Sequence, residues 1–211
     1  SIPENGSFGN SQFSLREVFA EGTGVLPNQP KVTFWAGQRF YDRYDAHIND
    51  YYYLDMSGFG AGMTGWDLGV GELWVAVLGG TIDELNPDGT VRDAGTEAKR
   101  SLDLRWKGIP VAGGDLMLWA SGSAIQGQTT DSGVVAEDSR GVAIGAIHEI
   151  SGGGNWWNRF AILYGTGPSS NFRSELIPDL VNEEDPTRQT YIKDSSRLRV
   201  LNNTIWESGP W

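Results

Sequence analysis

The chain has 211 residues, enough for one domain and marginal for two. Its net charge of −11 excludes nucleic acid as an expected partner, since phosphates favour a basic surface, and the absence of cysteine excludes disulfide frameworks and thiolate metal sites. The 29 glycines and 11% aromatic residues are typical of short strands joined by turns rather than of a helical bundle. Because no stretch reaches the roughly 20 apolar residues of a spanning helix, a helical membrane protein is excluded but a β-barrel is not.

Strand-like segments alternate with turns along most of the chain, after a polar, turn-rich stretch at 1–13. Strands are expected at Leu15–Glu21, Val32–Gly37, within Asp67–Gly79, and at Ser101–Lys107, Asp115–Ser121, Gly141–Glu149, Arg159–Gly165 and Arg197–Ile205. Long polar segments at 79–99, 122–140 and 166–196 alternate with short turns, as in outer-membrane barrels. The pattern predicts an all-β fold of roughly eight to ten strands in a single domain over 1–211.

The segment Ser101–Lys107 shows the clearest alternation of apolar and polar residues. Its apolar positions are Leu102, Leu104 and Trp106, and the polar positions between them are Ser101, Asp103 and Arg105. A soluble β-sandwich produces this pattern with the apolar face buried against a second sheet. A membrane barrel produces it with the apolar face toward lipid and the polar face toward a wet lumen. Periodicity alone does not separate the two architectures.

The most informative stretch runs from Trp35 to Gly62 and reads WAGQRFYDRYDAHINDYYYLDMSGFGAG. It mixes arginine and aspartate with a series of tyrosines and ends in a glycine cluster that we expect to form a sharp turn. Arg and Asp side chains exchange hydrogen bonds with sugar hydroxyls, and aromatic rings receive the apolar face of a pyranose. The same mixture could also form an ordinary long loop that binds nothing.

This stretch resembles the third extracellular loop of the maltoporin family, and the similarity extends upstream through LREVFAEG and downstream through WDLGVGELWVA. Weaker similarity continues from WNRFAILYGTG to LRVLNN. The resemblance implies an antiparallel up-and-down transmembrane β-barrel, of which this chain would cover about half of the family's eighteen strands. It further implies a homotrimer in contact with the lipid of the bacterial outer membrane, and facilitated diffusion of maltodextrin-like oligosaccharides.

Within the family, the matching segment folds into the barrel and narrows the channel, so residues 38–62 are expected to form an in-folded constriction loop. Arg43, Asp45, Asp50 and Tyr52 match loop positions that line the constriction, and Arg16 matches an arginine of the facing wall. The resemblance implies that the charged groups exchange hydrogen bonds with passing sugar, while Tyr52 supplies a bulky ring. Alternatively, the charged residues form salt bridges that only fold the loop.

Two further aromatic residues correspond to family positions. Trp157, in NWWNRF, matches an aromatic residue of the ladder along which maltoporins guide sugar. Phe8 falls where the family places an aromatic residue that reaches into the channel of a neighbouring subunit. The surrounding NGSFGNSQFS shares almost nothing with its family counterpart, so this second match depends on spacing alone.

Metal-dependent and enzymatic functions find little support in the residues. His47 has no partner histidine at metal-ligand spacing, because His148 is about a hundred residues away, and we expect no metal and no cofactor. Asp45 and Asp50 should both stay ionised beside arginine, whereas glycoside hydrolysis needs one protonated acid. Asp55 is expected to anchor the loop. The chain contains no catalytic serine motif or phosphate-binding loop.

Three functions therefore remain open: a sugar-selective outer-membrane porin, a soluble β-sandwich carbohydrate-binding module, and an outer-membrane barrel without sugar preference. The porin interpretation leaves an unexplained feature, because half a barrel has two open strand edges that lipid does not tolerate. A fragment or partial chain of a longer porin is the favoured explanation, and a smaller relative that closes differently is the alternative.

Overall fold

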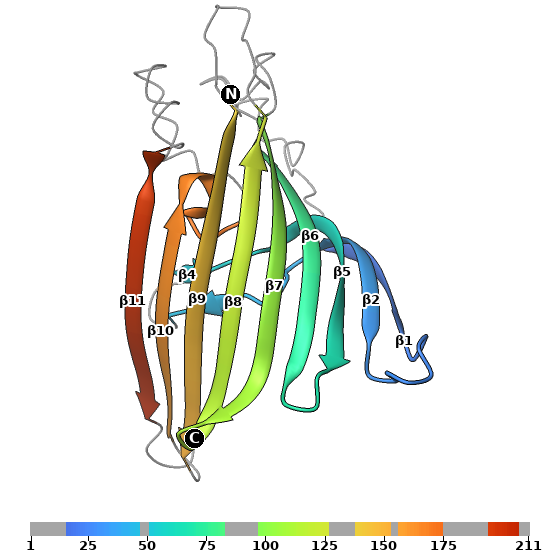
Figure 1. Cartoon of the computed structure of the whole chain (residues 1–211), viewed down its shortest axis with the longest axis vertical. Coiled ribbons are helices and arrows are strands. Elements are labelled where there is room, and N and C mark those ends of the chain that lie inside the picture. The colour runs from blue at the N-terminus through green and yellow to red at the C-terminus, as the bar shows by residue number, and fades with distance from the viewer. Residues whose placement is uncertain are drawn as a thin grey trace, which may run out of the picture.

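The computed structural model describes residues 16–46, 51–82, 97–126, 138–152, 156–174 and 194–206. Its main element is one antiparallel sheet in the order β1-β2-β5-β6-β7-β8-β9-β10-β11, accompanied by a small sheet of β3 and β4 (Figure 1). The strands are β1 (Val18–Thr23), β2 (Thr33–Arg39), β3 (Tyr44–Asp45), β4 (Tyr52–Leu54), β5 (Gly58–Asp67), β6 (Glu72–Ile82), β7 (Glu97–Val111), β8 (Gly114–Ile125), β9 (Ser139–Gly152), β10 (Trp156–Thr166) and β11 (Ser196–Trp206). A short 3₁₀ helix, η2 (Gly167–Ser169), follows β10. The expected all-β, antiparallel fold is confirmed.

The connections between sheet neighbours alternate in length. Shorter links join β1 to β2, β5 to β6, β7 to β8 and β9 to β10, whereas the links from β2, β6, β8 and β10 to the next sheet strand are longer. Because neighbouring strands are antiparallel, the short turns lie together at one end of the sheet, the lower end in Figure 1. We call this the turn end.

The two faces of the sheet have the opposite polarity to those of a soluble sandwich. On β7, the side chains of Leu102, Leu104 and Trp106 are 44%, 37% and 38% exposed. The residues between them, Ser101, Asp103 and Arg105, are buried. The sandwich alternative required the apolar residues to be buried, and this expectation is wrong. The polar residues are covered instead because other parts of the chain lie on their side of the sheet.

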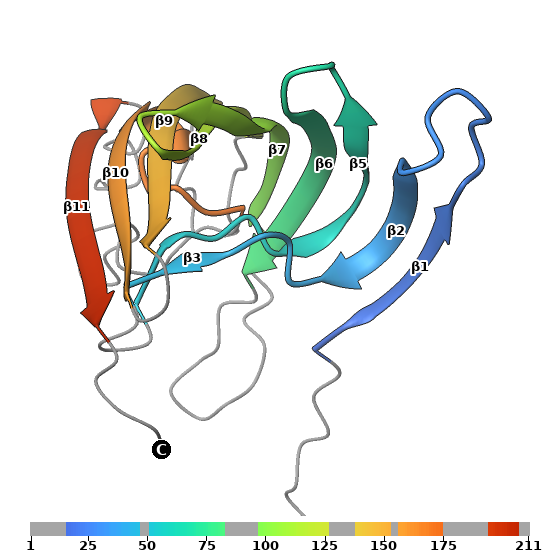
Figure 2. The same ribbon diagram turned by 90° about the horizontal axis from the view of Figure 1, so that it is seen from below.

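The sheet is strongly curved, and β3 and β4 lie on its concave side (Figure 2). A cluster of buried side chains joins the two layers and includes Trp35, Tyr41, Tyr53, Trp119 and Phe172. The convex face carries exposed apolar side chains from successive strands. They include Leu104 and Leu118 on β7 and β8, Val142 and Ile144 on β9, Phe160, Ile162 and Tyr164 on β10, and Leu198 and Val200 on β11.

The glycine cluster SGFGAG does not form the expected sharp turn, because Gly58 to Gly62 lie inside β5. Glycine is needed here for close approach. A Cβ atom at Gly60 would lie 2.2 Å from the carbonyl oxygen of Val77, and one at Gly62 would lie 2.8 Å from Trp35 Nε1. The cluster therefore makes room for a neighbouring strand and for a tryptophan ring.

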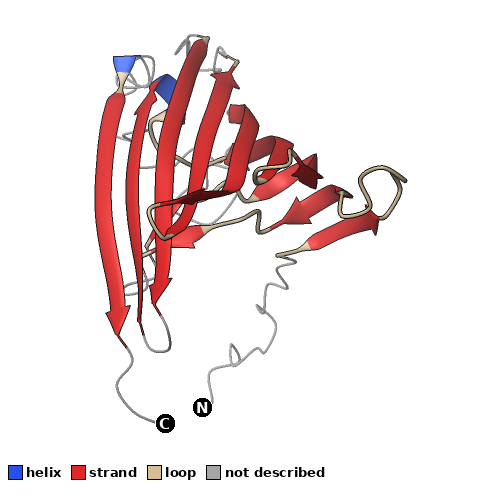
Figure 3. Cartoon of the chain, turned by 60° about the horizontal axis from the view of Figure 1, so that its bottom comes forward, coloured by secondary structure: helices blue, strands red, loops and turns tan. Residues whose placement is uncertain are grey.

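Strands make up most of the described chain (Figure 3), and no described helix is long and apolar enough to cross a membrane, a result that carries no information about crossing by strands. The nine strands form an open series whose edges are β1 and β11.

Candidate functional site

The site is built by the chain between β2 and β5, which leaves the sheet after Arg39 and returns at Gly58. It crosses the concave side of the sheet, where β3 and β4 pair with each other (Figure 2). The amide of Ala46 donates to the carbonyl oxygen of Tyr51 at 3.0 Å and extends this pairing. We call residues 40–57 the inner segment, of which 47–50 lie outside the described residues.

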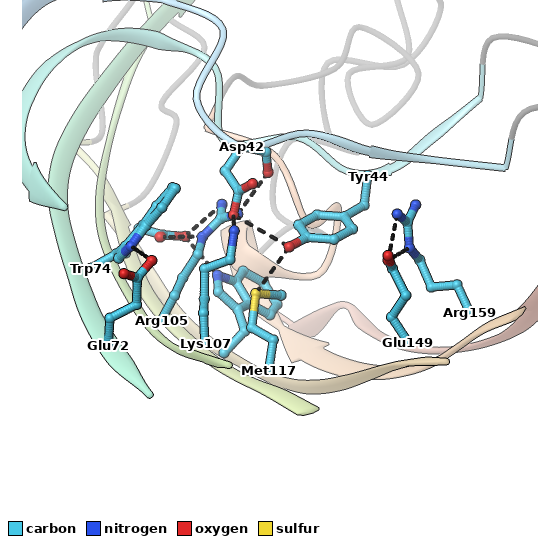
Figure 4. A network of polar contacts seen from close by, with 11 residues as sticks. Asp42, Tyr44, Glu72, Trp74, Arg105, Lys107, Met117, Glu149 and Arg159 are labelled. Carbon is cyan, nitrogen blue, oxygen red and sulfur yellow. Dashed lines mark hydrogen bonds and ion pairs between the residues drawn. The ribbon is translucent and has the colours of Figure 1, made fainter. Parts of the chain in front are cut away.

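Asp42 is the main polar contact between the inner segment and the sheet (Figure 4). Its Oδ2 atom lies 2.7 Å from Arg105 Nη1 and 2.7 Å from Lys107 Nζ, both on β7. The hydroxyl of Tyr44 donates to the same oxygen at 3.4 Å. The backbone at Asp42 has a φ of 39°, a left-handed conformation that aspartate adopts more readily than most residues.

Arg105 continues this contact into the sheet wall. Its side chain is 0% exposed, and its Nε atom donates to Asp103 Oδ1 at 2.7 Å. Asp103 Oδ2 in turn accepts a 2.6 Å hydrogen bond from Trp119 Nε1 on β8. A buried charge is tolerated only when it is paired and hydrogen-bonded, and here each charged group has both kinds of partner. The network therefore links β8, β7 and the inner segment.

The electrostatics of the inner segment follow from this arrangement. Burial would raise the pKa of the Asp42 carboxyl, but attraction to Arg105 and Lys107 and their hydrogen bonds outweigh burial and hold that pKa below its ordinary value. Burial and the neighbouring Asp42 carboxylate raise the pKa of the Tyr44 phenol above its ordinary value. At neutral pH the site therefore holds a carboxylate at Asp42 beside a neutral phenol at Tyr44.

A second contact lies farther along the sheet, at Tyr44. The guanidinium carbon of Arg159 on β10 lies 5.1 Å from the centre of the Tyr44 ring, a cation–π distance. Arg159 is itself held by Glu149 on β9, through Nε at 2.7 Å and Nη2 at 2.6 Å. On its other side, the Tyr44 hydroxyl lies 3.4 Å from Met117 Sδ (Figure 4). Tyr44 thus connects the inner segment to β8 and β10.

Arg43 is stacked between two aromatic rings of the inner segment. Its guanidinium carbon lies 3.8 Å from the centre of the Phe40 ring and 4.4 Å from that of Tyr52. Arg43, Asp45 and Tyr52 are all half-buried. The structure therefore brings Arg43 and Tyr52 into contact, with Asp45 in the adjoining β3 strand.

A cavity of about 540 Å³ opens between the inner segment and the turn end of the sheet. Tyr44 and Met117 border it, together with Lys107, Glu72 and Glu149. Its volume lies within the range of about 300–1,000 Å³ that is usual for small-molecule sites. Charged groups and apolar surface share its walls.

The other residues singled out from the sequence lie elsewhere. Trp157 is half-buried on β10, on the same side as Arg159, whose guanidinium carbon lies 4.8 Å from the centre of its ring. Arg16 is exposed next to the edge strand β1. Phe8, His47 and Asp50 lie outside the described residues. Among the residues that the structure describes, no group of three or more His, Cys, Asp or Glu side chains could hold a metal ion.

Sequence reasoning missed the residues that hold the inner segment, chiefly Asp42, Arg105 and Lys107. A signal for the wall was present, since Asp103 and Arg105 alternate with apolar residues. The partner across the interior was not recognisable, because Asp42 and Arg105 are separated by 63 positions. Asp55 was expected to anchor the loop, and its backbone pairs with residues 172–174.

The sheet is curved, with exposed apolar residues on its convex face and with both charged and aromatic residues on its concave face, which the inner segment crosses. The family model described as LamB porin matches residues 3–211, nearly the whole sequence. The chain belongs to the LamB porin family. Porins of this family are channels of the bacterial outer membrane rather than enzymes, and they cross it with β-strands.

A curated relative of this LamB porin is a protein named "Maltoporin" from Photobacterium profundum, which is 42% identical over 69 residues. The matched stretch covers 33% of the present chain and 16% of the relative. The chain therefore aligns with a small part of that relative's length.

Proposed function

We propose that this LamB porin is a sugar-selective channel of the bacterial outer membrane that allows facilitated diffusion of maltodextrin-like oligosaccharides. The observation that carries the proposal is the inner segment, whose aromatic and charged side chains are fixed against a charged wall on the concave side of the sheet. The convex face, rich in exposed apolar side chains, suits contact with lipid. The relative named "Maltoporin" supports a sugar as the solute.

In this proposal, the nine-stranded sheet is about half of an eighteen-stranded barrel, and the intact protein forms a homotrimer. Segment 38–62, whose two ends belong to β2 and β5, carries the proposed constriction loop of a single barrel domain, and the inner segment is the part that leaves the sheet. Antiparallel pairing exposes one unpaired edge at β1 and another at β11, and further strands would satisfy both.

Arg43, Asp45, Asp50 and Tyr52 are proposed to line the constriction, with Arg16 on the wall. The stack of Arg43 on Tyr52 and Phe40 supports this role, because a ring beside a guanidinium offers both an apolar surface and hydrogen-bond donors. Trp157 and Phe8 are proposed as further aromatic positions along the sugar path. Water and neighbouring groups satisfy these side chains when sugar is absent, so binding stays weak enough for transit.

The test uses the intact protein in planar lipid bilayers. Maltodextrins of increasing length should interrupt the ion current in a concentration-dependent way, and Tyr52→Ala should raise the half-saturating concentration by about tenfold, the value of one lost ring contact. Phe59→Ala is the matched control, since Phe59 is an exposed aromatic residue of β5 just after the inner segment. Channels that conduct ions without any response to maltodextrins would refute sugar selectivity. A response to maltodextrins in Tyr52→Ala that equals the wild-type response would show that Tyr52 does not contribute to sugar binding.

A further inference from the structure

A second stretch of chain also lies on the concave side of the sheet. After β10, residues 167–174 pass through η2 and continue inward, and Pro168, Ser169, Ser170, Asn171, Phe172 and Ser174 are all buried. Connecting segments usually run over the surface, because a buried one must find partners for its backbone polar groups. We call residues 167–174 the second inner segment.

Lys99 on β7 supplies several of those partners. Its side chain is 0% exposed, and its Nζ atom donates to the carbonyl oxygens of Pro168 and Arg173, each at 2.5 Å, and to Asn171 Oδ1 at 2.9 Å. All three acceptors belong to the second inner segment, and all three are neutral oxygens. A buried ammonium is costly unless all its donors are used, and here three acceptors match its three protons.

The second inner segment in turn holds the return arm of the inner segment, residues 52–57. The amide of Asp55 donates to the carbonyl oxygen of Phe172 at 3.0 Å, and the amide of Ser174 donates to that of Asp55 at 3.1 Å. The Ser174 hydroxyl donates to the carbonyl oxygen of Ser57. These contacts are made largely by backbone atoms. The position of the return arm inside the curved sheet therefore depends on where the second inner segment lies.

The second inner segment is also fixed from behind, at Phe172. The ring of Phe172 packs edge-on against Trp119 of β8, with centres 6.1 Å apart, and Arg199 of β11 lies 4.8 Å from its centre. The backbone of Phe172 has a φ of 58°, a left-handed conformation that persists only when the surroundings impose it. The segment is therefore held in one position by three strands.

We propose that Lys99 is a positioning residue of the channel. By fixing the second inner segment to the sheet, Lys99 sets the position of residues 52–57 on the concave side. This inference rests on the proposed function, because it concerns the same passage. Lys99 touches neither the Arg43 stack nor the cavity at the turn end. It acts through Arg173, whose Nη2 atom also donates to the carbonyl oxygen of Tyr52 at 3.4 Å.

The experiment compares single channels of the intact wild-type protein with those of Lys99→Met, which keeps the length of the side chain and removes its donors. We expect a higher single-channel conductance and a half-saturating maltodextrin concentration raised by about tenfold, the effect of one misplaced polar contact. Arg100→Met is the matched control, because Arg100 is the adjacent cation on β7 but is exposed. Channels of Arg100→Met should have the wild-type conductance and the wild-type half-saturating maltodextrin concentration.

Single-channel readouts separate positioning from simple stabilisation. A purely structural role would lower the yield of folded channels and leave the conductance of each remaining channel unchanged, and that result would overturn the proposal. If Lys99→Met gives no folded channels, Ser174→Ala decides the matter, since it removes only the bond to Ser57. Wild-type conductance in Ser174→Ala would then count against the proposal. A wild-type channel that ignores maltodextrins refutes the proposed function instead, and leaves the conductance comparison valid.

Discussion

The convex and concave faces of the sheet are made from alternate residues of the same strands, yet they have opposite characters. On β7, Leu104 is exposed on one face, whereas Arg105 and Asp103 are buried on the other. Burial usually follows hydrophobicity, and a strand that buries its charges and exposes its leucines has the reverse arrangement. The inner segments, which include the small β3–β4 sheet, cover the polar face, and the apolar face is suited to a non-aqueous neighbour.

The largest effect is expected from breaking the charge network of the concave face. Arg105→Met leaves the carboxylates of Asp103 and Asp42 without their guanidinium, so the free energy of unfolding should fall by about 3–5 kcal/mol. Urea unfolding of the protein in lipid vesicles measures this change. Arg100→Met removes an exposed arginine from the same strand and should change the free energy little. Equal losses in both variants would show that the concave network does not stabilise the fold.

The next effect tests the convex face. Ile144→Arg places a charge in the middle of the exposed apolar band on β9, where lipid contact makes it cost about 2–4 kcal/mol. The fraction of protein that folds into vesicles should therefore fall. Val25→Arg is a close control, because Val25 is 62% exposed and Ile144 is 61% exposed, but Val25 lies in the link between β1 and β2. If Ile144→Arg inserts as well as Val25→Arg, the convex face does not contact lipid.

Sequence patterns predicted most strands of the sheet, several of them in shortened form, because strand periodicity is a local property, but they missed β5. The alternation of Ser101, Asp103 and Arg105 also identified one face of β7 as polar. It could not show which face is covered, since a soluble sandwich and a membrane barrel share the pattern. Glycine at 60 and 62 was wrongly interpreted as a turn, because a glycine required by a close strand neighbour has the same local signature as one required by a bend.

The candidate site was predictable only in part, for a related reason. The Trp35–Gly62 motif pointed to the inner segment, and Arg43 and Tyr52 do lie together. The residues that hold this segment were not recognised, because their contacts are non-local. Lys99 and Asn171, for example, are 72 positions apart. Spacing along the chain carries no information about such pairs.

A smaller effect on the free energy of unfolding is expected where Gly62 leaves space for the ring of Trp35. Gly62→Ala would place a Cβ atom 2.6 Å from the carbonyl oxygen of Val75 and 2.8 Å from Trp35 Nε1. The resulting crowding should lower the free energy of unfolding by about 1–3 kcal/mol. Gly122→Ala is the control, because a Cβ atom there meets nothing within 4 Å. A stable Gly62→Ala variant would mean that the Trp35 ring can move aside at little cost.

The smallest effect is a pH dependence at Asp42, where the inner segment meets the wall. The pKa of this carboxyl lies below its ordinary value of 3.8 despite burial, because Arg105 and Lys107 favour the charged form. A lowered pKa stabilises the folded state above the ordinary value, and this stabilisation is lost as the pH falls through the lowered value. Attachment of the inner segment should therefore be constant from neutral pH to about pH 4 and weaken only in stronger acid.

Single-channel current of the wild type should become noisier below about pH 4, whereas Asp42→Asn channels should be noisy at every pH. Wild-type channels that become noisy near neutral pH would point to a different titrating group, and attachment of the inner segment to the wall would then not depend on Asp42.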